Sequence, residues 1–367
     1  MALGPNDLKN VAIPTAWDAA EISRLALADG TTYETLIRDI NAAVGVFNGS
    51  LTGGYWANLL SVTEEAGMEY GQGAGNAFED ATEYGQGDAQ RAATSGHMLP
   101  LRYLDYKMGW TARWLEDARR VQIDNDINAM LDAARDVFEK RVLTRLFKLE
   151  EETGTAYGLG SSGVSVPFAD GGNGTIAYTP RPRFDRATAF SSTHTHFLRL
   201  NGITQANLVT AVKHLWEHGY DQVYDLLIAQ ADVSSWSNTT NVTGFKPRAD
   251  VATQYGQDVS LAIVSDEYIG VVNTEYGTAR IKASARIPTG YWGVVKTYGA
   301  NDPRNPLRVR VKPSRGLGLR LQVDRIDRYP LAGAIPEMAF GVGVGMREAA
   351  VLVRNDSSGS YSTPTIS

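Results

Sequence analysis

The longest regular pattern of hydrophobic positions lies between Trp110 and Thr153, a stretch with no glycine and no proline. Its apolar residues recur every three or four positions, which is the spacing of one face of an α-helix. They are Ile123, Ile127, Met130, Leu131, Ala134, Phe138, Val142, Leu146 and Leu149. The pattern predicts a helix of about 28 residues, roughly 42 Å long. Asp124 is its expected N-cap and Thr153-Gly154 its expected end. This length suits a structural backbone better than a compact enzyme domain.

A second amphipathic helix is predicted from Thr204, as its cap, to about His218, with Gly219 ending it. The expected inner face consists of Leu208, Ala211, Val212 and Leu215. Short runs of strand-like residues follow it and alternate with turns. They cover residues 225–229, 259–264, 278–287, 290–295, 307–311 and 349–353. The predicted fold class is therefore α+β with one dominant helix.

Three other stretches have no strong periodicity. Residues 1–50 mix turn residues with short apolar pieces and predict an extended arm that carries one short helix. Residues 154–200 predict an extended excursion. Residues 66–96 are rich in Gly, Glu, Gln and Asp, and Glu69-Tyr70-Gly71-Gln72-Gly73 recurs at positions 83–87. Such a segment cannot bury enough apolar surface to offset its ordering entropy by itself. It is either a disordered loop or an arm ordered by a neighbouring subunit.

Composition narrows the class of protein. The 367 residues allow two or three domains, and the net charge of −6 gives no electrostatic case for wrapping nucleic acid. Since there is no cysteine, disulfides and thiolate catalysis are excluded. The N-terminal residues lack the pattern of a signal peptide, and no apolar run reaches the length of a membrane span. We therefore expect a soluble chain that stays in the cytoplasm and has no membrane partner.

Two pairs of histidines could bind a metal. His214-Leu215-Trp216-Glu217-His218 fits the H-x-x-E-H pattern of inverted zinc peptidases. It lies at the end of its helix, and no good downstream helix offers the further acidic ligand. A solvated helix end, where histidines suit the dipole, is the favoured interpretation. His194-Thr195-His196 would place two rings on one face of a strand. Nothing nearby obviously completes four ligands, so packing or a subunit contact is favoured.

Glycine-rich and basic segments are the other candidates for a binding site. Residues 158–163 match G-x-G-x-x-G but lack the preceding strand and following helix of a dinucleotide site. Residues 341–345 are better explained as a glycine-rich strand or turn. The one notable basic cluster consists of Arg308, Arg310, Lys312, Arg315, Arg320, Arg325 and Arg328. It favours a solvated strand face or salt bridges at a subunit boundary, and a face towards packaged DNA is the alternative.

The order of these parts resembles the Hong Kong 97-type major capsid protein family of tailed double-stranded DNA bacteriophages. The resemblance covers most of the chain but lies in pattern more than in strict motifs. Residues 106–117 look like the family's strand that runs into a short acidic helical segment, and residues 123–152 look like its spine helix. Similar stretches also occur at residues 190–197, 204–220, 223–229, 271–290 and 329–353.

The resemblance implies an α+β fold with an N-terminal arm, an extended loop, a long spine helix, and peripheral and axial domains. The expected parts are the arm (1–50), the extended loop (51–106), the peripheral domain with the spine helix (107–200), the axial domain (201–326), strands that return to the peripheral domain (327–355) and a C-terminal tail (356–367).

The implied function is structural and not enzymatic. Such a chain assembles with itself into pentamers and hexamers of an icosahedral shell around double-stranded DNA, which it would contact without sequence specificity. Expected partners are a separate scaffold protein, a portal and a cement protein, and the expected location is the virion capsid, assembled in the host cytoplasm. No catalytic residue, cofactor or metal is implied. The residues expected at subunit interfaces are Tyr70, Gln72, Tyr84, Gln86, Arg91, Arg113 and Asp117.

One departure from the family is informative. Some members cross-link a loop lysine to an asparagine of another subunit, but this chain has no lysine between Lys9 and Lys107. We therefore expect a shell without isopeptide bonds. The nearest alternative function is an encapsulin-type nanocompartment shell, which shares the fold. The alternative from another class is a zinc hydrolase that uses His214 and His218.

Overall fold

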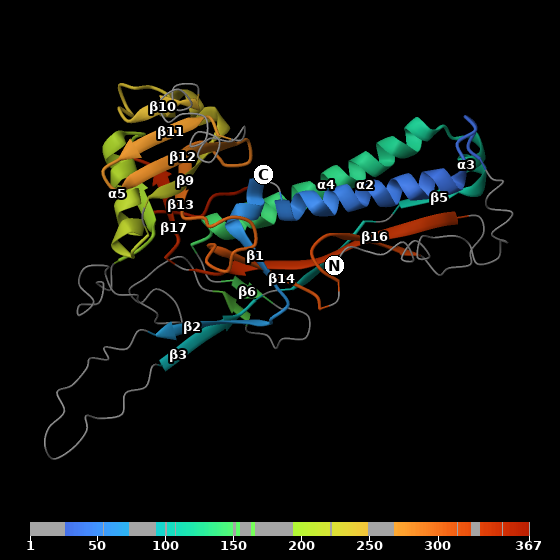
Figure 1. The fold of residues 1–367 in the computed structure, drawn as a ribbon, viewed down its shortest axis with the longest axis horizontal. Coiled ribbons are helices and arrows are strands. Elements are labelled where there is room, and N and C mark those ends of the chain that lie inside the picture. The colour runs from blue at the N-terminus through green and yellow to red at the C-terminus, as the bar shows by residue number, and fades with distance from the viewer. Residues whose placement is uncertain are drawn as a thin grey trace, which may run out of the picture. The chain divides into compact units, whose positions relative to one another are not determined.

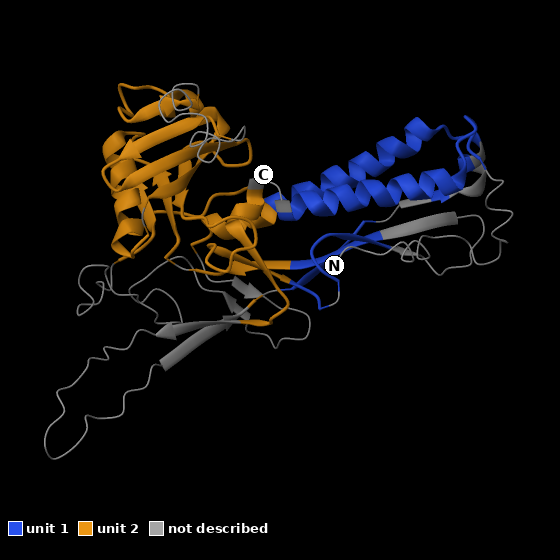
Figure 2. Ribbon diagram, in the orientation of Figure 1, with its two compact units in different colours: residues 1–54, 101–139, 311–340 blue, residues 55–100, 140–310, 341–367 orange. Residues whose placement is uncertain are grey.

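The chain contains both helices and sheets (Figure 1), and it divides into two compact units (Figure 2). The first unit comprises residues 1–54, 101–139 and 311–340, and the second comprises residues 55–100, 140–310 and 341–367. The computed structural model describes residues 26–53, 55–72, 93–99, 101–106, 108–149, 152–154, 163–165, 194–220, 222–248, 268–313, 315–323, 331–346 and 348–366.

Two helices, α2 (Tyr33–Gly53) and α4 (Arg120–Phe147), run side by side in the first unit, and α4 continues into the second. They begin at the same end, because Asp39 of α2 pairs with Arg120 of α4, with Oδ2 2.8 Å from Nη1. Further along, the guanidinium of Arg135 lies over the ring of Phe47, 5.9 Å from its centroid. The buried face of α4 includes Ile123, Ile127, Met130, Phe138, Val142 and Leu146, as predicted.

The length of α4 is the predicted 28 residues, but both of its ends differ from the prediction. The helix begins at Arg120, whose backbone N–H donates to Asp29 Oδ2 at 2.7 Å. This carboxylate satisfies one of the N–H groups that a helix start leaves free. Asp124, the expected cap, lies inside the helix and pairs with Arg120 at 3.2 Å. Thr153 and Gly154 belong to strand β6 (Glu152–Gly154) and not to the helix end.

The segment expected to be an arm with one short helix is largely helical where it is described. Residues 33–53 form α2, which is 21 residues long, while residues 1–25 lie outside the described part of the chain. Gly45 and Gly49 lower the intrinsic helix propensity of this stretch, which led to the wrong expectation. Packing overrides that propensity. The side chains buried at helical spacing are Leu36, Val44, Phe47 and Leu51.

Strand β16 (Leu331–Val344) belongs to a six-stranded sheet, and its residues up to Phe340 lie in the first unit. It pairs antiparallel with β15 (Leu319–Val323) on one edge and with β4 (Arg102–Asp105) and β5 (Met108–Thr111) on the other. Pro336 cannot donate to a ladder, and it occupies the position between the β5 and β4 pairings. There its carbonyl accepts from Tyr106 N at 2.9 Å.

The short helix α3 (Ala112–Asp117) follows β5, so the strand and helical segment expected over residues 106–117 are confirmed. The rings of Trp110 and Trp114 stack across this junction, with centroids 6.3 Å apart. Trp110 also donates from Nε1 to Asp126 Oδ2 of α4 at 2.9 Å. These contacts join the strand, the short helix and the long helix in one place.

The second unit is built on a seven-stranded sheet with the order β10-β11-β12-β9-β13-β17-β8. Two neighbouring pairs, β12 with β9 and β17 with β8, are parallel, and the other pairings described are antiparallel. The strands are β8 (Phe197–Leu200), β9 (Val223–Ala229), β10 (Phe245–Pro247), β11 (Gly270–Thr274), β12 (Gly277–Ser284), β13 (Tyr291–Val295) and β17 (Ala350–Asn355). The strands predicted at residues 225–229, 278–287, 290–295 and 349–353 are confirmed with small shifts, while residues 259–264 lie outside the described chain.

Helix α5 (Gln205–Glu217) covers one face of this sheet and contacts β11, β13 and β17. It starts and ends as predicted, because Thr204 Oγ1 accepts from Asn207 N at 3.2 Å and Gly219 has φ +96°. All four expected inner residues, Leu208, Ala211, Val212 and Leu215, are fully buried. Two short helical segments, η3 (Gln230–Asp232) and α6 (Val233–Trp236), follow β9, and Trp236 packs edge-on against Trp292 in the same core.

The second unit also contains strand β1 (Leu60–Thr63), which follows a 3₁₀ turn, η2 (Tyr55–Leu59), and pairs in parallel with β14 (Leu307–Val311). After β1 come two antiparallel two-stranded sheets. One joins β2 (Gly67–Gln72) to β3 (Ala93–Met98), and the other joins β6 to β7 (Gly163–Ser165). Strands β3 and β7 contact each other. No helix among the described residues combines the length and apolar character that a bilayer span requires.

Candidate functional site

The hairpin of β2 and β3 is the described part of the loop that was expected to reach another subunit. Its register pairs Tyr70 with Ser95 and Gln72 with Ala93. Tyr70 and Gln72 are therefore in the hairpin, whereas the expected interface residues Tyr84, Gln86 and Arg91 lie outside the described chain. A two-stranded hairpin is at best marginally stable alone in water, so it needs a further surface.

The stem of this hairpin is held by a buried asparagine. Asn305 is fully buried and donates from Nδ2 to the carbonyls of Leu60 and Gly299, at 2.9 and 2.7 Å. Its Oδ1 accepts from Tyr298 N at 3.0 Å, so its amide makes three hydrogen bonds. In the same turn Asn301 Oδ1 accepts from Val62 N at 2.7 Å. These bonds fix the strand from which the hairpin begins.

Exposed apolar side chains mark a second candidate surface, at the start of α4 in the first unit. Val121 is 59% exposed and Trp114 of α3 is 37% exposed. Asp117, one of the expected interface residues, is exposed between them, and Arg113 lies in α3. The apolar spacing of residues 120–147 predicts the buried face of α4 and does not predict Val121 as a surface contact. A valine that lies outside the buried face was the signal in the sequence that could have indicated it.

The side chains of the basic cluster contact different groups. Arg310 donates from Nη1 to the carbonyl of Leu99 at 2.8 Å, and Lys312 lies over the ring of Tyr103. Arg315 pairs with Glu337, whereas Arg320 is exposed. Arg325 and Arg328 lie outside the described residues. The side chains with described partners contact groups of their own chain, and salt bridges at a subunit boundary stay a prediction.

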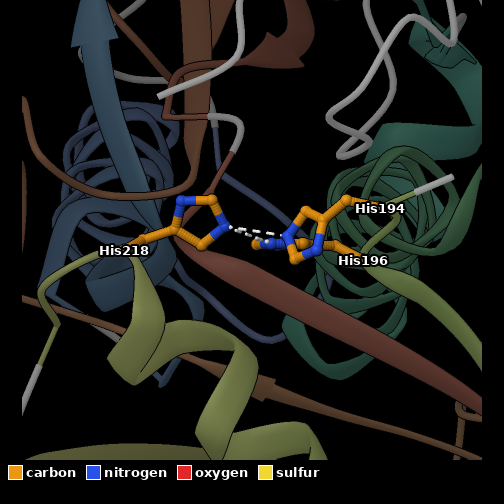
Figure 3. Close-up of side chains that lie close together, drawn as sticks. All are labelled: His194, His196 and His218. Carbon is orange, nitrogen blue, oxygen red and sulfur yellow. Dashed lines mark hydrogen bonds between the residues drawn. The ribbon is translucent and has the colours of Figure 1, made fainter. Parts of the chain in front are cut away.

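The two histidine pairs, which lie apart in the sequence, meet in the second unit (Figure 3). His194 and His196 precede β8, and His218 is the C-cap of α5. His218 Nε2 lies 3.1 Å from His194 Nε2 and 2.9 Å from His196 Nε2. His196 is fully buried, and its Nδ1 lies 2.7 Å from the carbonyl oxygen of Ala350. The spacing within each pair does not predict this group of three, because the two pairs lie far apart along the chain.

The H-x-x-E-H pattern does not form the centre of an inverted zinc peptidase. His218 belongs to the group of three, whereas His214 makes other contacts. The ring of His214 stacks on His194, and the Nδ1 of His214 lies 2.9 Å from the carbonyl oxygen of Thr210. Glu217, the expected base, pairs with Lys213 of its own helix at 3.6 Å. The glycines at residues 341–344 lie in β16, so the strand interpretation of that segment is confirmed; residues 158–162 lie outside the described chain.

Comparisons with known proteins bear on the fold. No protein-family model and no curated protein matches the chain. A solved structure from Mycobacterium phage Patience is similar to it, with a TM-score of 0.63 and 21% identity over 96% of this chain and 97% of the other. The mature capsid of bacteriophage PhiM1 has a TM-score of 0.47 and 11% identity, over 83% of this chain and 88% of the other. The holo-SrpI encapsulin complex from Synechococcus elongatus has a TM-score of 0.44 and 11% identity, over 99% of both chains.

Proposed function

We propose that this chain, which has the α+β Hong Kong 97-type capsid fold, is the major capsid protein of a tailed double-stranded DNA bacteriophage. It assembles with itself into pentamers and hexamers, and these close into an icosahedral shell around the genome. The role is structural, and the location of the assembled protein is the virion capsid.

The observation that carries this proposal is the similarity of fold to the phage Patience structure over 96% of the chain. A likeness confined to one domain would leave the other parts free to serve another function. Here the alignment covers 96% of this chain and 97% of the other.

The hairpin supports assembly on physical grounds. Strands β2 and β3 pair only with each other among the described strands, and their one neighbour named above, β7, belongs to another two-stranded sheet. Such small sheets are marginal in water. A neighbouring copy supplies the missing surface. Each such contact can be weak, because many identical contacts act together in a closed shell. Tyr70, Gln72, Tyr84, Gln86 and Arg91 of the loop, with Arg113 and Asp117 of α3, are the residues proposed to make subunit contacts.

Other partners follow from the same proposal. A scaffold protein, a portal and a cement protein would act on a shell assembled in the host cytoplasm. The net charge of −6 argues against strong wrapping of DNA by the chain. We propose that the genome is enclosed by proximity, without sequence recognition.

Negative-stain electron microscopy of the purified chain tests the proposal. The expected result is uniform polyhedral particles, or rings of five and six subunits. A chain that stays monomeric at high concentration contradicts the proposal. Particles from the native source are then treated with nuclease, and their contents are identified. Protected double-stranded DNA supports a virus, whereas a packaged enzyme without DNA assigns the shell to an encapsulin.

A deletion variant tests the loop directly. Residues 73–92 are replaced by Asn-Gly, which closes a tight turn between Gln72 and Ala93, the last pair of the hairpin. We expect a folded capsomer with an unchanged melting temperature that no longer forms closed shells. A matched control replaces the same residues by an equal number of glycines and serines, which retains length but removes side chains. Normal shells from the deletion variant would exclude the loop from assembly.

A further inference from the structure

Four of the chain's five histidines gather at one place in the second unit, where the end of α5 meets the start of β8. Three of them, His194, His196 and His218, direct ring nitrogens to a common point (Figure 3). These ligand atoms all lie within 4.8 Å of one another. The proposed role in a shell does not require this arrangement.

The hydrogen bond of His196 determines which of its nitrogens can act as a metal ligand. A carbonyl oxygen only accepts, so the Nδ1 that lies 2.7 Å from Ala350 O carries the proton. In the neutral ring Nε2 then holds a lone pair. The bond also fixes the orientation of the ring, as carbonyl partners of metal-bound histidines do.

Hydrogen bonds among the three rings do not explain this arrangement well. His218 Nε2 lies within hydrogen-bond distance of the Nε2 atoms of both His194 and His196. If His218 Nε2 carries a proton, the Nε2 atoms of His194 and His196 must share that one hydrogen. If His218 Nε2 carries no proton, its lone pair faces the lone pair of His196 Nε2. A single cation at the common point can accept all three lone pairs. In a tetrahedral zinc site the nitrogens are roughly 3.3 Å apart. Two of the three pairs lie near this value, at 2.9 and 3.1 Å, and all three ligand atoms lie within 4.8 Å of one another.

The local electrostatics also favour a cation. His218 is the C-cap of α5, where the carbonyl groups of the last turn and the helix dipole place partial negative charge. Among the described strands β8 pairs with β17 alone and forms the edge of the seven-stranded sheet, so a metal here would tie that edge strand to the end of the helix.

We propose that His194, His196 and His218 form a binding site for a divalent transition metal of the zinc class, with a structural role. Imidazole nitrogens are ligands that such metals favour. Three histidines leave a fourth position for water. His214 is not a ligand, since its ring stacks on that of His194.

Metal binding is tested on the full chain purified without a histidine tag. Zinc is titrated by calorimetry, and cobalt is added separately because tetrahedral cobalt has a strong visible absorption. The expected result is one equivalent of zinc per chain, a tetrahedral cobalt spectrum and a melting temperature that rises with zinc and falls with a chelator.

The variants His194→Asn and His218→Asn should each weaken zinc binding at least tenfold and remove the cobalt spectrum. Asparagine is tolerated at a helix end, so His218→Asn should keep α5 intact. The matched control, His214→Asn, removes the neighbouring histidine and should bind one equivalent. Two results overturn the proposal: no stoichiometric binding by the unaltered chain, or binding that persists in the double variant of His194 and His218. Circular dichroism of each variant checks that a loss of binding is not a loss of fold.

Discussion

At the scale of single residues, the least replaceable group described is the buried carboxylate of Asp225 in β9. It accepts from Arg280 Nε at 2.8 Å and from Tyr268 and Thr297 hydroxyls at 3.0 and 2.8 Å. Lys282 Nζ lies 3.9 Å away, and both Asp225 and Lys282 are almost fully buried. The anion therefore balances two cations on β12, of which Lys282 is almost fully buried and Arg280 is partly exposed.

We expect Asp225→Asn to lower the free energy of unfolding by about 3 kcal/mol or more, because it leaves buried cations uncompensated. Urea unfolding of the unassembled protein, followed by tryptophan fluorescence, measures this. The control Thr297→Val removes one neutral donor to the same carboxylate and should cost about 1 kcal/mol. Equal losses in the two variants would show that the charge itself contributes little.

At the scale of elements, Asn48 attaches α2 to the sheet of the first unit. Its amide bonds both ways with the backbone of Leu319 in β15, donating at 2.9 Å and accepting at 2.7 Å. Gly318 has φ +142°, and a Cβ there would lie 2.4 Å from Asn48 Cγ, so the close approach requires glycine. The helix and the strand are thus fitted to each other at one point.

The substitution Asn48→Ala should destabilise the protein by roughly 1–3 kcal/mol, because it leaves both backbone groups of Leu319 without this partner. Asn41→Ala is the matched control on the same helix, since Asn41 Nδ2 bonds only to the carbonyl of Ile37 within α2. Thermal unfolding compares them. A loss in Asn41→Ala as large as that in Asn48→Ala would contradict this account.

The joint between the starts of α2 and α4 should depend on pH. The backbone N–H of Arg120 lowers the pKa of Asp29 below its ordinary 3.8, and the Arg120 side chain lowers the pKa of Asp39. A carboxyl with a lowered pKa in the folded state stabilises that state above pH 3.8 and loses this contribution as the pH falls through the lowered pKa.

Melting temperatures measured across that acid range should therefore fall more steeply for the unaltered chain than for the double variant Asp29→Asn and Asp39→Asn. Parallel curves would show that these two carboxylates do not contribute to acid sensitivity.

At the scale of the whole molecule, surface residues that do not stabilise the chain should decide whether it assembles. We expect Val121→Glu to leave the melting temperature of the unassembled protein unchanged and to reduce shell formation, because it places a charge on an exposed apolar position. Asn128→Glu, at an exposed position of the same helix, is the control. Sedimentation analysis of both variants distinguishes shells from free subunits. Equal assembly would remove Val121 from the proposed contacts.

The missing lysines lead to a second prediction at this scale. Since no lysine lies between Lys9 and Lys107, mature shells should separate into chains of 39.8 kDa under denaturing electrophoresis. A ladder of covalent oligomers would contradict it.

Elements defined by local patterns could be predicted closely. The length of α4, the cap and inner face of α5, and strands β9, β12, β13, β14 and β17 follow from the spacing of apolar residues. The predicted bounds of helices are wrong where contacts with residues distant in the sequence determine them. Helix α4 starts at Arg120 and not at the predicted cap, because Asp29 accepts from the backbone N–H of Arg120. Residues 33–53 form a long helix despite two glycines, because packing stabilises it.

The candidate sites divide in the same way. The sequence by itself determined the α+β class and the absence of lysine from the loop, because these are properties of local composition and periodicity. Only the tertiary structure decided that His218 meets His194 and His196, and that His214 stacks on His194 without belonging to the group of three. The spacing of residues along a chain cannot report which helix end lies beside which strand, since that depends on how the whole core packs.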